Sequence, residues 1–218
     1  MTKRFIIGIS LLILFTTFIS QKEITIEKFK IKIIQIENNN LLSETDIKKE
    51  LLSIYNENLV FINLDKVKKI LRQNTYIESF QVKKKYPDIL IIKIFEKKPI
   101  AILQKKKERF YLSEKIELIK FENLHIYKDL PIIFGNEKDF QIFYYNLKKV
   151  NFPLESIKKY YFFESNRWDL ITQDEKTIKL PSINYIESLK NFLDIKYRNE
   201  FKKYKIFDYR IDDQLILK

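Results

Sequence analysis

The sequence has 218 residues, of which 45% are apolar, and a formal net charge of +12. That length fits one large domain or two small ones, and 18 Phe and 13 Tyr supply enough large side chains for a packed core. There is no cysteine and a single histidine, His125, which excludes disulfides, cysteine metal sites and histidine-rich metal sites. A basic surface favours anionic partners, but scattered lysines carry most of the charge, which is typical of a solubilising surface.

The first residues have the pattern of a membrane-targeting segment. Lys3 and Arg4 precede an almost entirely apolar run at 5–19. A cleaved signal peptide shares these features, but bulky residues stand where a cleavage site has small ones. A buried core helix is a weaker alternative, because charges flank the run. We therefore expect a transmembrane anchor at 5–21 after a short cytoplasmic start at 1–4, with the rest of the chain outside the cytoplasm.

That anchor is short for a membrane. About 16 apolar residues cover roughly 24 Å as a helix, whereas the hydrocarbon core of a bilayer is about 30 Å thick.

After the apolar run, the sequence predicts a small α+β domain with two helices on one face of a three-stranded sheet. Alternating and helical spacings of apolar residues predict this order. Ser43 and Asn63 stand where helix N-caps are expected. The last strand is almost continuously apolar, so we expect it to be buried on both faces. The order is strand, helix, helix, strand, strand, at about 29–36, 44–55, 64–73, 77–86 and 89–95.

From Pro99 onward the sequence predicts a β-rich region with two helices. A stiff extended piece at 130–135 ends in one of the two glycines of the chain, and the chain closes with a final strand at 206–217. The other strands are predicted at 100–104, 108–112, 116–121, 157–164, 167–173 and 176–180, and the helices at 137–150 and 184–203.

Several short motifs, taken in order, resemble the FtsQ/DivIB family of bacterial cell-division proteins. They are Tyr-Pro-Asp-Ile-Leu at 86–90, Glu-Lys-Lys-Pro-Ile-Ala at 96–101, Leu-Pro-Ile-Ile-Phe-Gly at 130–135, Arg-Trp-Asp-Leu at 167–170, Leu-Pro at 180–181 and Ile-Phe-Asp-Tyr-Arg at 206–210. Three positions depart from the family pattern. Asn38 replaces a glycine, Tyr86 replaces a tryptophan, and the hairpin at 113–115 lacks the usual Asp and Gly.

The resemblance implies an α+β protein with an N-terminal transmembrane helix, a POTRA domain (βααββ) at 29–98 and a β-rich domain at 99–218. In the latter, two helices pack on an antiparallel sheet. It also implies a single-pass protein of the cell inner membrane at the division septum, with a cytoplasmic N-terminus and periplasmic C-terminal domains.

The function implied by the resemblance is that of a division scaffold and not of an enzyme. Such a protein binds the FtsB–FtsL pair and links early division proteins to septal peptidoglycan synthesis, with FtsK, FtsW and FtsI as further partners. Neither a cofactor, a metal, a nucleic acid nor a small-molecule substrate is implied. Two other functions stay open: another exported POTRA module that binds proteins, and an exported cell-wall enzyme, for which His125 is the residue to test.

The partner-binding residues carried over from the family lie near the C-terminus. A final strand at a sheet edge exposes backbone N–H and C=O groups that can accept a partner strand. By position, Arg210, Ile211, Asp213 and Gln214 lie on that strand. Arg167, beside Trp168, is the second arginine expected to reach an acidic residue of the partner. The simpler alternative is that Trp168 belongs to the core and Arg167 pairs with a local carboxylate.

An acidic trio, Asp208, Asp212 and Asp213, stands in the same segment. A metal site there needs further carboxylates from elsewhere, so we interpret the trio as solvated surface.

Overall fold

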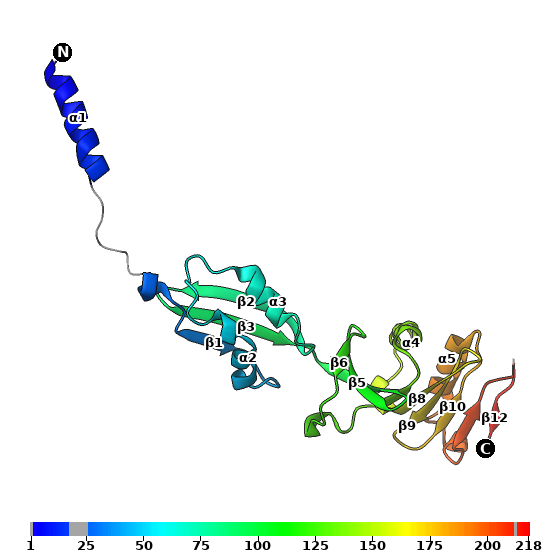
Figure 1. Cartoon of the computed structure of the whole chain (residues 1–218). Coiled ribbons are helices and arrows are strands. Elements are labelled where there is room, and N and C mark those ends of the chain that lie inside the picture. The colour runs from blue at the N-terminus through cyan, green and yellow to red at the C-terminus, as the bar shows by residue number, and fades with distance from the viewer. Residues whose placement is uncertain (1, 18–25, 212) are drawn as a thin grey trace. The chain divides into compact units, whose positions relative to one another are not determined.

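The computed structural model describes residues 2–17, 26–211 and 213–218 (Figure 1). The chain divides into two compact units, Met1–Phe95 and Glu96–Lys218. Helix α1 spans Thr2–Thr17. Within the described residues, no helix combines the length and the apolar character needed to cross a membrane. Part of the predicted anchor at 5–21 lies outside the described residues, and its role as a membrane span stays a prediction.

The first unit contains a three-stranded sheet in the order β1-β3-β2, with β1 (Ile33–Glu37) parallel to β3 (Ile89–Glu96). Strand β2 (Ile77–Lys85) forms the other edge. Helices α2 (Glu44–Glu50) and α3 (Leu64–Leu71) contribute buried residues to the same core as the sheet. The predicted element order is confirmed.

Two details of the first unit differ from the predictions. The predicted helix at 44–55 ends at Glu50, and a separate 3-10 turn follows at Leu52–Ile54. The expected burial of the last strand on both faces is wrong, because its residues alternate between buried and partly exposed along β3. Period-two burial is what a sheet shows when only one of its faces is covered.

The two predicted helix caps behave differently. Asn63 caps α3, since its side-chain oxygen accepts a hydrogen bond from the backbone N–H of Asp65 at 2.9 Å. Ser43 occupies the N-cap position of α2, but its side chain makes no cap hydrogen bond. Its hydroxyl oxygen instead lies 2.6 Å from that of Thr45.

Asparagines hold many of the left-handed backbone positions. Five asparagines have positive φ: Asn38, Asn56, Asn151, Asn166 and Asn184. Asparagine tolerates this conformation better than other non-glycine residues. Asn38, which replaces the family's glycine, has φ of 64°, and its side-chain amide donates to the Ile94 carbonyl oxygen at 2.7 Å.

The second unit is built on a nine-stranded sheet in the order β12-β11-β10-β9-β8-β7-β4-β5-β6. Its two α-helices are α4 (Glu137–Lys149) and α5 (Tyr185–Ile195). The 3-10 turns are η3 (His125–Tyr127), η4 (Leu154–Ser156) and η5 (Asn199–Phe201). The strands are β4 (Pro99–Lys105), β5 (Glu108–Ser113), β6 (Leu118–Lys120), β7 (Ile132–Phe134), β8 (Ile157–Phe163), β9 (Arg167–Thr172), β10 (Thr177–Lys179), β11 (Ile206–Asp208) and β12 (Ile216–Leu217).

The prediction of an antiparallel sheet is wrong, because the sheet is mixed. The pairs β4–β7, β7–β8 and β10–β11 are parallel. Helix α4 connects β7 to β8, and helix α5 connects β10 to β11. A helical crossover returns the chain to the same end of the sheet, so the two strands that it joins run in the same direction.

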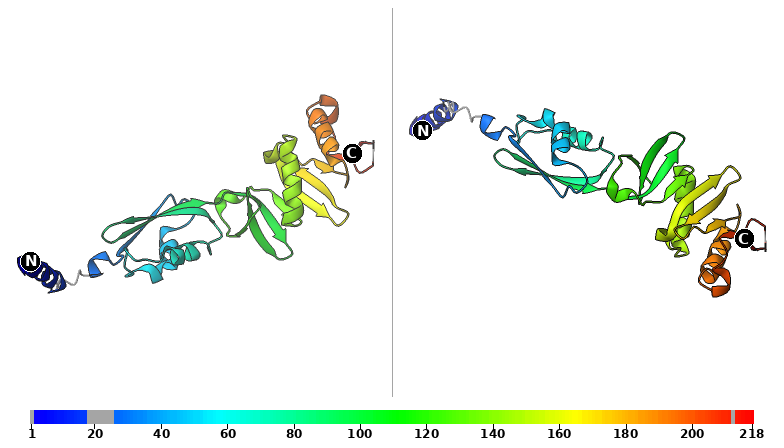
Figure 2. Two further views of the ribbon diagram at one scale, coloured as in Figure 1. Left: turned by 90° about the horizontal axis from the view of Figure 1, so that it is seen from above. Right: turned by 90° about the horizontal axis from the view of Figure 1, so that it is seen from below.

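Helices α4 and α5 pack on the same face of the sheet. Figure 2 shows α4 (yellow-green) and α5 (orange) side by side against the strands, and the Asn146 amide of α4 donates to the Tyr185 hydroxyl of α5 at 2.5 Å. Their buried aromatic residues join one core with alternate residues of the strands. Gly135 belongs to this packing, because a Cβ atom there would lie only 2.9 Å from the Cβ of Phe162.

Candidate functional site

The C-terminal end of the sheet differs from the predicted single strand at 206–217. The segment forms two short antiparallel strands, β11 and β12, and the described residues between them, 209–211 and 213–215, form a loop. The predicted residues Arg210, Ile211, Asp213 and Gln214 therefore lie in this loop and not on a strand. Two local features explain the break: Arg210 folds back onto Asp208, and Asp213 has a positive φ of 59°.

Strand β12 ends the sheet, and no strand of the described residues pairs with its outer side. Ile206 and Lys218 exchange two backbone hydrogen bonds, at 2.9 and 3.1 Å. In an antiparallel pair the backbone groups of successive residues point alternately to the partner and away from it. The N–H and C=O of Leu217 therefore point outward, where a further strand could pair with them.

Arg210 and Asp208 form a two-point ion pair beside this edge. The Nε atom of Arg210 lies 2.8 Å from Oδ1 of Asp208, and its Nη2 atom lies 2.7 Å from Oδ2. The backbone N–H of Arg210 also donates to Oδ1, at 3.2 Å. Hydrogen bonding by the Arg210 guanidinium lowers the pKa of the Asp208 carboxyl below its ordinary value. The pair therefore holds the start of the loop in place.

A second arginine lies on the same side of the sheet, on β9. Cross-strand pairing puts Asp169, Lys179 and Asp208 in one row on the face turned away from α4 and α5. Arg167 is two residues before Asp169, so its side chain points to that face as well. Its guanidinium carbon lies 4.3 Å from the centre of the Phe163 ring.

Arg167 and Asp169 are close but imperfectly paired. The Arg167 Nε atom lies 3.6 Å from Asp169 Oδ1. That distance allows an ion pair but is too long for a hydrogen bond, and both atoms are buried without a hydrogen-bond partner in the described part of the chain. Burial raises the pKa of the Asp169 carboxyl, against the opposing effect of Arg167. The two arginines and two aspartates thus form one charged cluster with unused hydrogen-bonding capacity.

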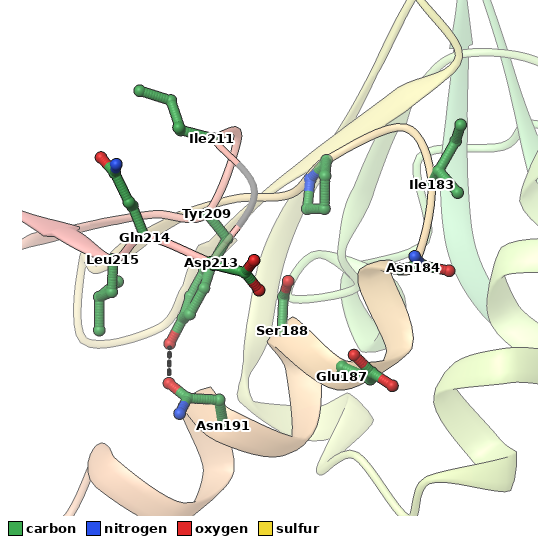
Figure 3. A pocket seen from close by; sticks show the side chains of 11 residues that line it. Ile183, Asn184, Glu187, Ser188, Asn191, Tyr209, Ile211, Asp213, Gln214 and Leu215 are labelled. Carbon is green, nitrogen blue, oxygen red and sulfur yellow. Dashed lines mark hydrogen bonds between the residues drawn. The ribbon is translucent and has the colours of Figure 1, made fainter.

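A hollow of about 490 Å³ lies between helix α5 and the loop that separates β11 from β12 (Figure 3). The Tyr209 hydroxyl donates to Oδ1 of Asn191 at 2.9 Å, which ties the loop to the helix. In Figure 3, Asp213 points toward α5, whereas Ile211 and Gln214 point away from it. The hollow is lined by Pro181, Ile183, Asn184, Glu187, Ser188, Asn191, Tyr209, Ile211, Asp213, Gln214 and Leu215.

The structure brings most of the predicted partner-binding residues to one end of the sheet. Ile211, Asp213 and Gln214 line the same hollow. Arg167 and Arg210 each lie beside an aspartate of the same cross-strand row, Asp169 and Asp208, which places them in the same charged cluster. Whether these residues bind a partner stays a prediction.

Trp168 lies elsewhere. Its side chain is only 5% exposed and stacks on the Phe143 ring of α4, with 4.8 Å between the ring centres. The simpler alternative therefore describes this residue better than contact with a partner does. Asp169, next to it, was not selected from the sequence, although the alternation along β9 would have placed it on the face of Arg167.

Two apolar side chains at the rim of the hollow are largely exposed, Ile183 at 73% and Ile211 at 52%. Among the described residues, no group of three or more His, Cys, Asp or Glu side chains could hold a metal ion.

Comparisons with known proteins agree with the resemblance seen in the motifs. The model of the POTRA domain, FtsQ-type, matches residues 29–97. The cell division protein FtsQ of Rickettsia bellii is 28% identical over 191 residues, which cover 84% of this chain and 69% of that protein. The cell division protein DivIB of Clostridium tetani is 30% identical over 174 residues, which cover 78% of this chain and 62% of that protein.

A solved structure was also found. The major extracytoplasmic domain of DivIB from Geobacillus stearothermophilus is similar to this chain at 13% identity and a TM-score of 0.34, covering 49% of this chain and 96% of that one.

Proposed function

Because this chain belongs to the FtsQ/DivIB family of cell-division proteins, we propose that it is a division scaffold whose C-terminal sheet edge binds the FtsB–FtsL pair. The observation that supports this best is the outer side of β12, which no described strand covers and which lies beside the Arg210–Asp208 pair. We propose no catalytic step and no cofactor.

The edge of β12 supports binding by strand addition. A partner strand would pair with the outward N–H and C=O of Leu217, and the sheet would extend by one strand. Only two residues belong to β12, so backbone pairing alone gives few hydrogen bonds. Side-chain contacts around the strand are therefore needed for a stable complex.

The two arginines favour a partner that carries acidic residues. Each guanidinium has five N–H donors, and Arg210 gives two of its side-chain bonds to Asp208. Its side chain is still 42% exposed, so part of it can meet a carboxylate of the partner. The Arg167 side chain is 26% exposed, so the exposed part of its guanidinium can also meet a carboxylate, whereas its buried Nε atom lies beyond a partner's reach.

The remaining parts of the proposal concern the membrane and the septum. We propose that α1, with the apolar residues that follow it in sequence, anchors the chain in the inner membrane with the domains at 29–98 and 99–218 on the periplasmic side. In that position the chain links early division proteins, with FtsK, FtsW and FtsI as further partners, to septal peptidoglycan synthesis.

The proposed edge binding is tested with Leu217→Pro in the full chain, with Leu217→Ala as the matched control. Both variants lose the leucine side chain, but only proline removes the outward N–H. We expect Leu217→Ala to retain the FtsB–FtsL pair in a pull-down and Leu217→Pro to lose it, with both variants folded by circular dichroism. Equal binding by the two variants contradicts strand addition, and no binding by the unchanged chain contradicts the choice of partner.

The division role itself is tested by localisation. A fluorescent fusion of the chain is expected to form a band at midcell, and protease added outside the inner membrane is expected to digest the domains at 29–98 and 99–218. An even membrane signal throughout the cell cycle would show that the chain has another role.

A further inference from the structure

One end of the first unit carries apolar side chains that face solvent. Phe61 is 82% exposed and Val60 is 40% exposed, in the loop that precedes α3. Tyr86, in the turn between β2 and β3, is 56% exposed. Single exposed apolar residues are ordinary on a protein surface, so the question is whether these three lie together.

Hydrogen bonds and ring contacts tie their segments together. The backbone N–H of Leu59 donates to the Phe29 carbonyl oxygen at 2.8 Å. The Lys84 ammonium donates to the Val60 carbonyl oxygen at 2.9 Å. The rings of Phe29 and Tyr86 meet edge to face, with 6.4 Å between their centres. The loop at 58–61, the β2–β3 turn and the start of the unit therefore meet at one end.

This is the end at which the chain enters the unit. Strands β1 and β3 are parallel and begin together, with Ile33 opposite Ile89. Eight residues separate Thr17, the last residue of α1, from Ile26. Eight residues reach at most about 29 Å when fully extended, so whatever holds α1 restrains this end more than any other part of the unit.

The segments that meet at this end are rich in lysine. Segments 27–32, 56–61 and 83–88 contain six lysines and three carboxylates. The Lys30 ammonium lies 2.8 Å from Glu27, and the Lys66 ammonium, outside these segments, pairs with Glu57. The lysines are Lys28, Lys30, Lys32, Lys83, Lys84 and Lys85, and the carboxylates are Glu27, Glu57 and Asp88.

We propose that this end of the first unit lies on an anionic lipid surface, with Phe61 and Val60 in the boundary between headgroups and acyl chains. Aromatic and aliphatic side chains with lysines at the same end of a domain are a combination that binds such an interface, and Tyr86 presents a ring with a polar tip, which suits headgroup depth. The inference rests on the proposed function in one respect, because α1 holds this end near the bilayer.

An anionic lipid surface accounts for the lysines at this end better than a protein partner does. Lysine carries a strongly hydrated point charge on a flexible stem, which serves a fluid layer of phosphates. Protein interfaces are depleted in lysine, whereas arginine is enriched there. The end in question carries six lysines and no arginine.

The test uses the full chain inserted into vesicles and the variant Phe61→Trp. Brominated acyl chains quench a tryptophan on contact, and the native Trp168 is buried in the other unit and serves as a constant background. The control is Tyr145→Trp, on helix α4, at a position that is 68% exposed. Circular dichroism verifies that both variants are folded.

We expect Phe61→Trp to lose emission on brominated vesicles that contain phosphatidylglycerol, and Tyr145→Trp to keep it. Adding Lys83→Glu and Lys85→Glu to Phe61→Trp is expected to remove the quenching. If Phe61→Trp is quenched no more than Tyr145→Trp, or if the two charge reversals change nothing, the inference is wrong.

Flotation of the chain with vesicles tests the proposed anchor independently of the lipid contact at position 61. A chain that floats with the vesicles after an alkaline wash, but shows no quenching at position 61, is anchored and does not use this end to touch lipid. A chain that fails to float contradicts the anchor and removes the lipid contact with it.

Discussion

Replacing Arg210 with alanine is expected to destabilise the second unit by about 2 kcal/mol at neutral pH, because it deprives Asp208 of its ion-pair partner. Asp208 is only 6% exposed, and the variant loses side-chain hydrogen bonds of 2.8 and 2.7 Å. A hydrogen bond to a charged group contributes about 1.5–3 kcal/mol. The Arg210 side chain is 42% exposed, so water screens the ion pair. The expected loss of stability is therefore near the lower end of this range.

The pH dependence follows from the direction of the Asp208 shift. Its pKa in the folded chain is lowered, mainly by hydrogen bonding from Arg210. An unfolded aspartate titrates near about 3.9. The stabilisation is therefore fully present above that pH and is lost as the pH falls through the lowered folded value. The difference between the Arg210→Ala variant and the unchanged chain should shrink in strong acid.

The assay is urea unfolding followed by the emission of Trp168, the single tryptophan of the chain, which lies in the core of this unit. Arg198→Ala provides the control, since Arg198 is an exposed arginine of the same unit. Surface substitutions of that kind change stability by no more than about 0.5 kcal/mol. Equal urea midpoints for the two variants would refute the reasoning. A loss of stability in Arg210→Ala that is as large in strong acid as at neutral pH would also refute it.

Three further outcomes are expected from the same unfolding measurements, with circular dichroism added for the first unit. Gly135→Ala should cost about 1–3 kcal/mol by overpacking, since its Cβ would lie 2.9 Å from the Cβ of Phe162, whereas Gly8→Ala meets nothing within 4 Å. Asn38→Ala should destabilise by about 1–2 kcal/mol, more than Asn38→Gly, because alanine loses the 2.7 Å hydrogen bond to Ile94 and also opposes the positive φ. Asp169→Asn should stabilise the chain at neutral pH, because burial raises the pKa of Asp169. Because the pKa of Asp169 is higher in the folded chain than in the unfolded chain, its ionised carboxylate destabilises the fold at high pH. The stability gained by Asp169→Asn should therefore vanish as the pH falls below the pKa of the unfolded chain.

The element order of the first unit, and that of the second up to its last strand, could be predicted from the sequence because it depends on local signals. The periodicity at 64–71 and the cap at Asn63 sufficed for α3, which the structure confirms. The direction of strands in the larger sheet was not accessible in this way. Whether β7 lies parallel to β4 depends on pairing between residues about 30 positions apart, as in Ile102 opposite Ile132, and periodicity carries no information about such pairs.

The candidate site shows the same division between local and distant effects. The apolar residues between 206 and 217 alternate well enough to predict a single strand. The chain turns instead, because the Arg210 guanidinium binds Asp208 two residues earlier and Tyr209 binds Asn191 of α5. The second of these contacts exists only after α5 has packed on the sheet. The position of the predicted residues around one hollow could therefore not be foreseen.

The asparagines at left-handed positions have a consequence for the gene as well as for the fold. Every glycine codon begins with two guanines, whereas the asparagine codons begin with two adenines. A fold whose turns accept asparagine, as at Asn38, Asn56, Asn151, Asn166 and Asn184, can therefore be encoded in DNA that is poor in guanine and cytosine. The two glycines of the chain are Gly8 and Gly135, and only Gly135 stands where a Cβ atom would collide with a neighbour. In this chain asparagine thus supplies, at five turns, the left-handed backbone conformation that glycine adopts most readily.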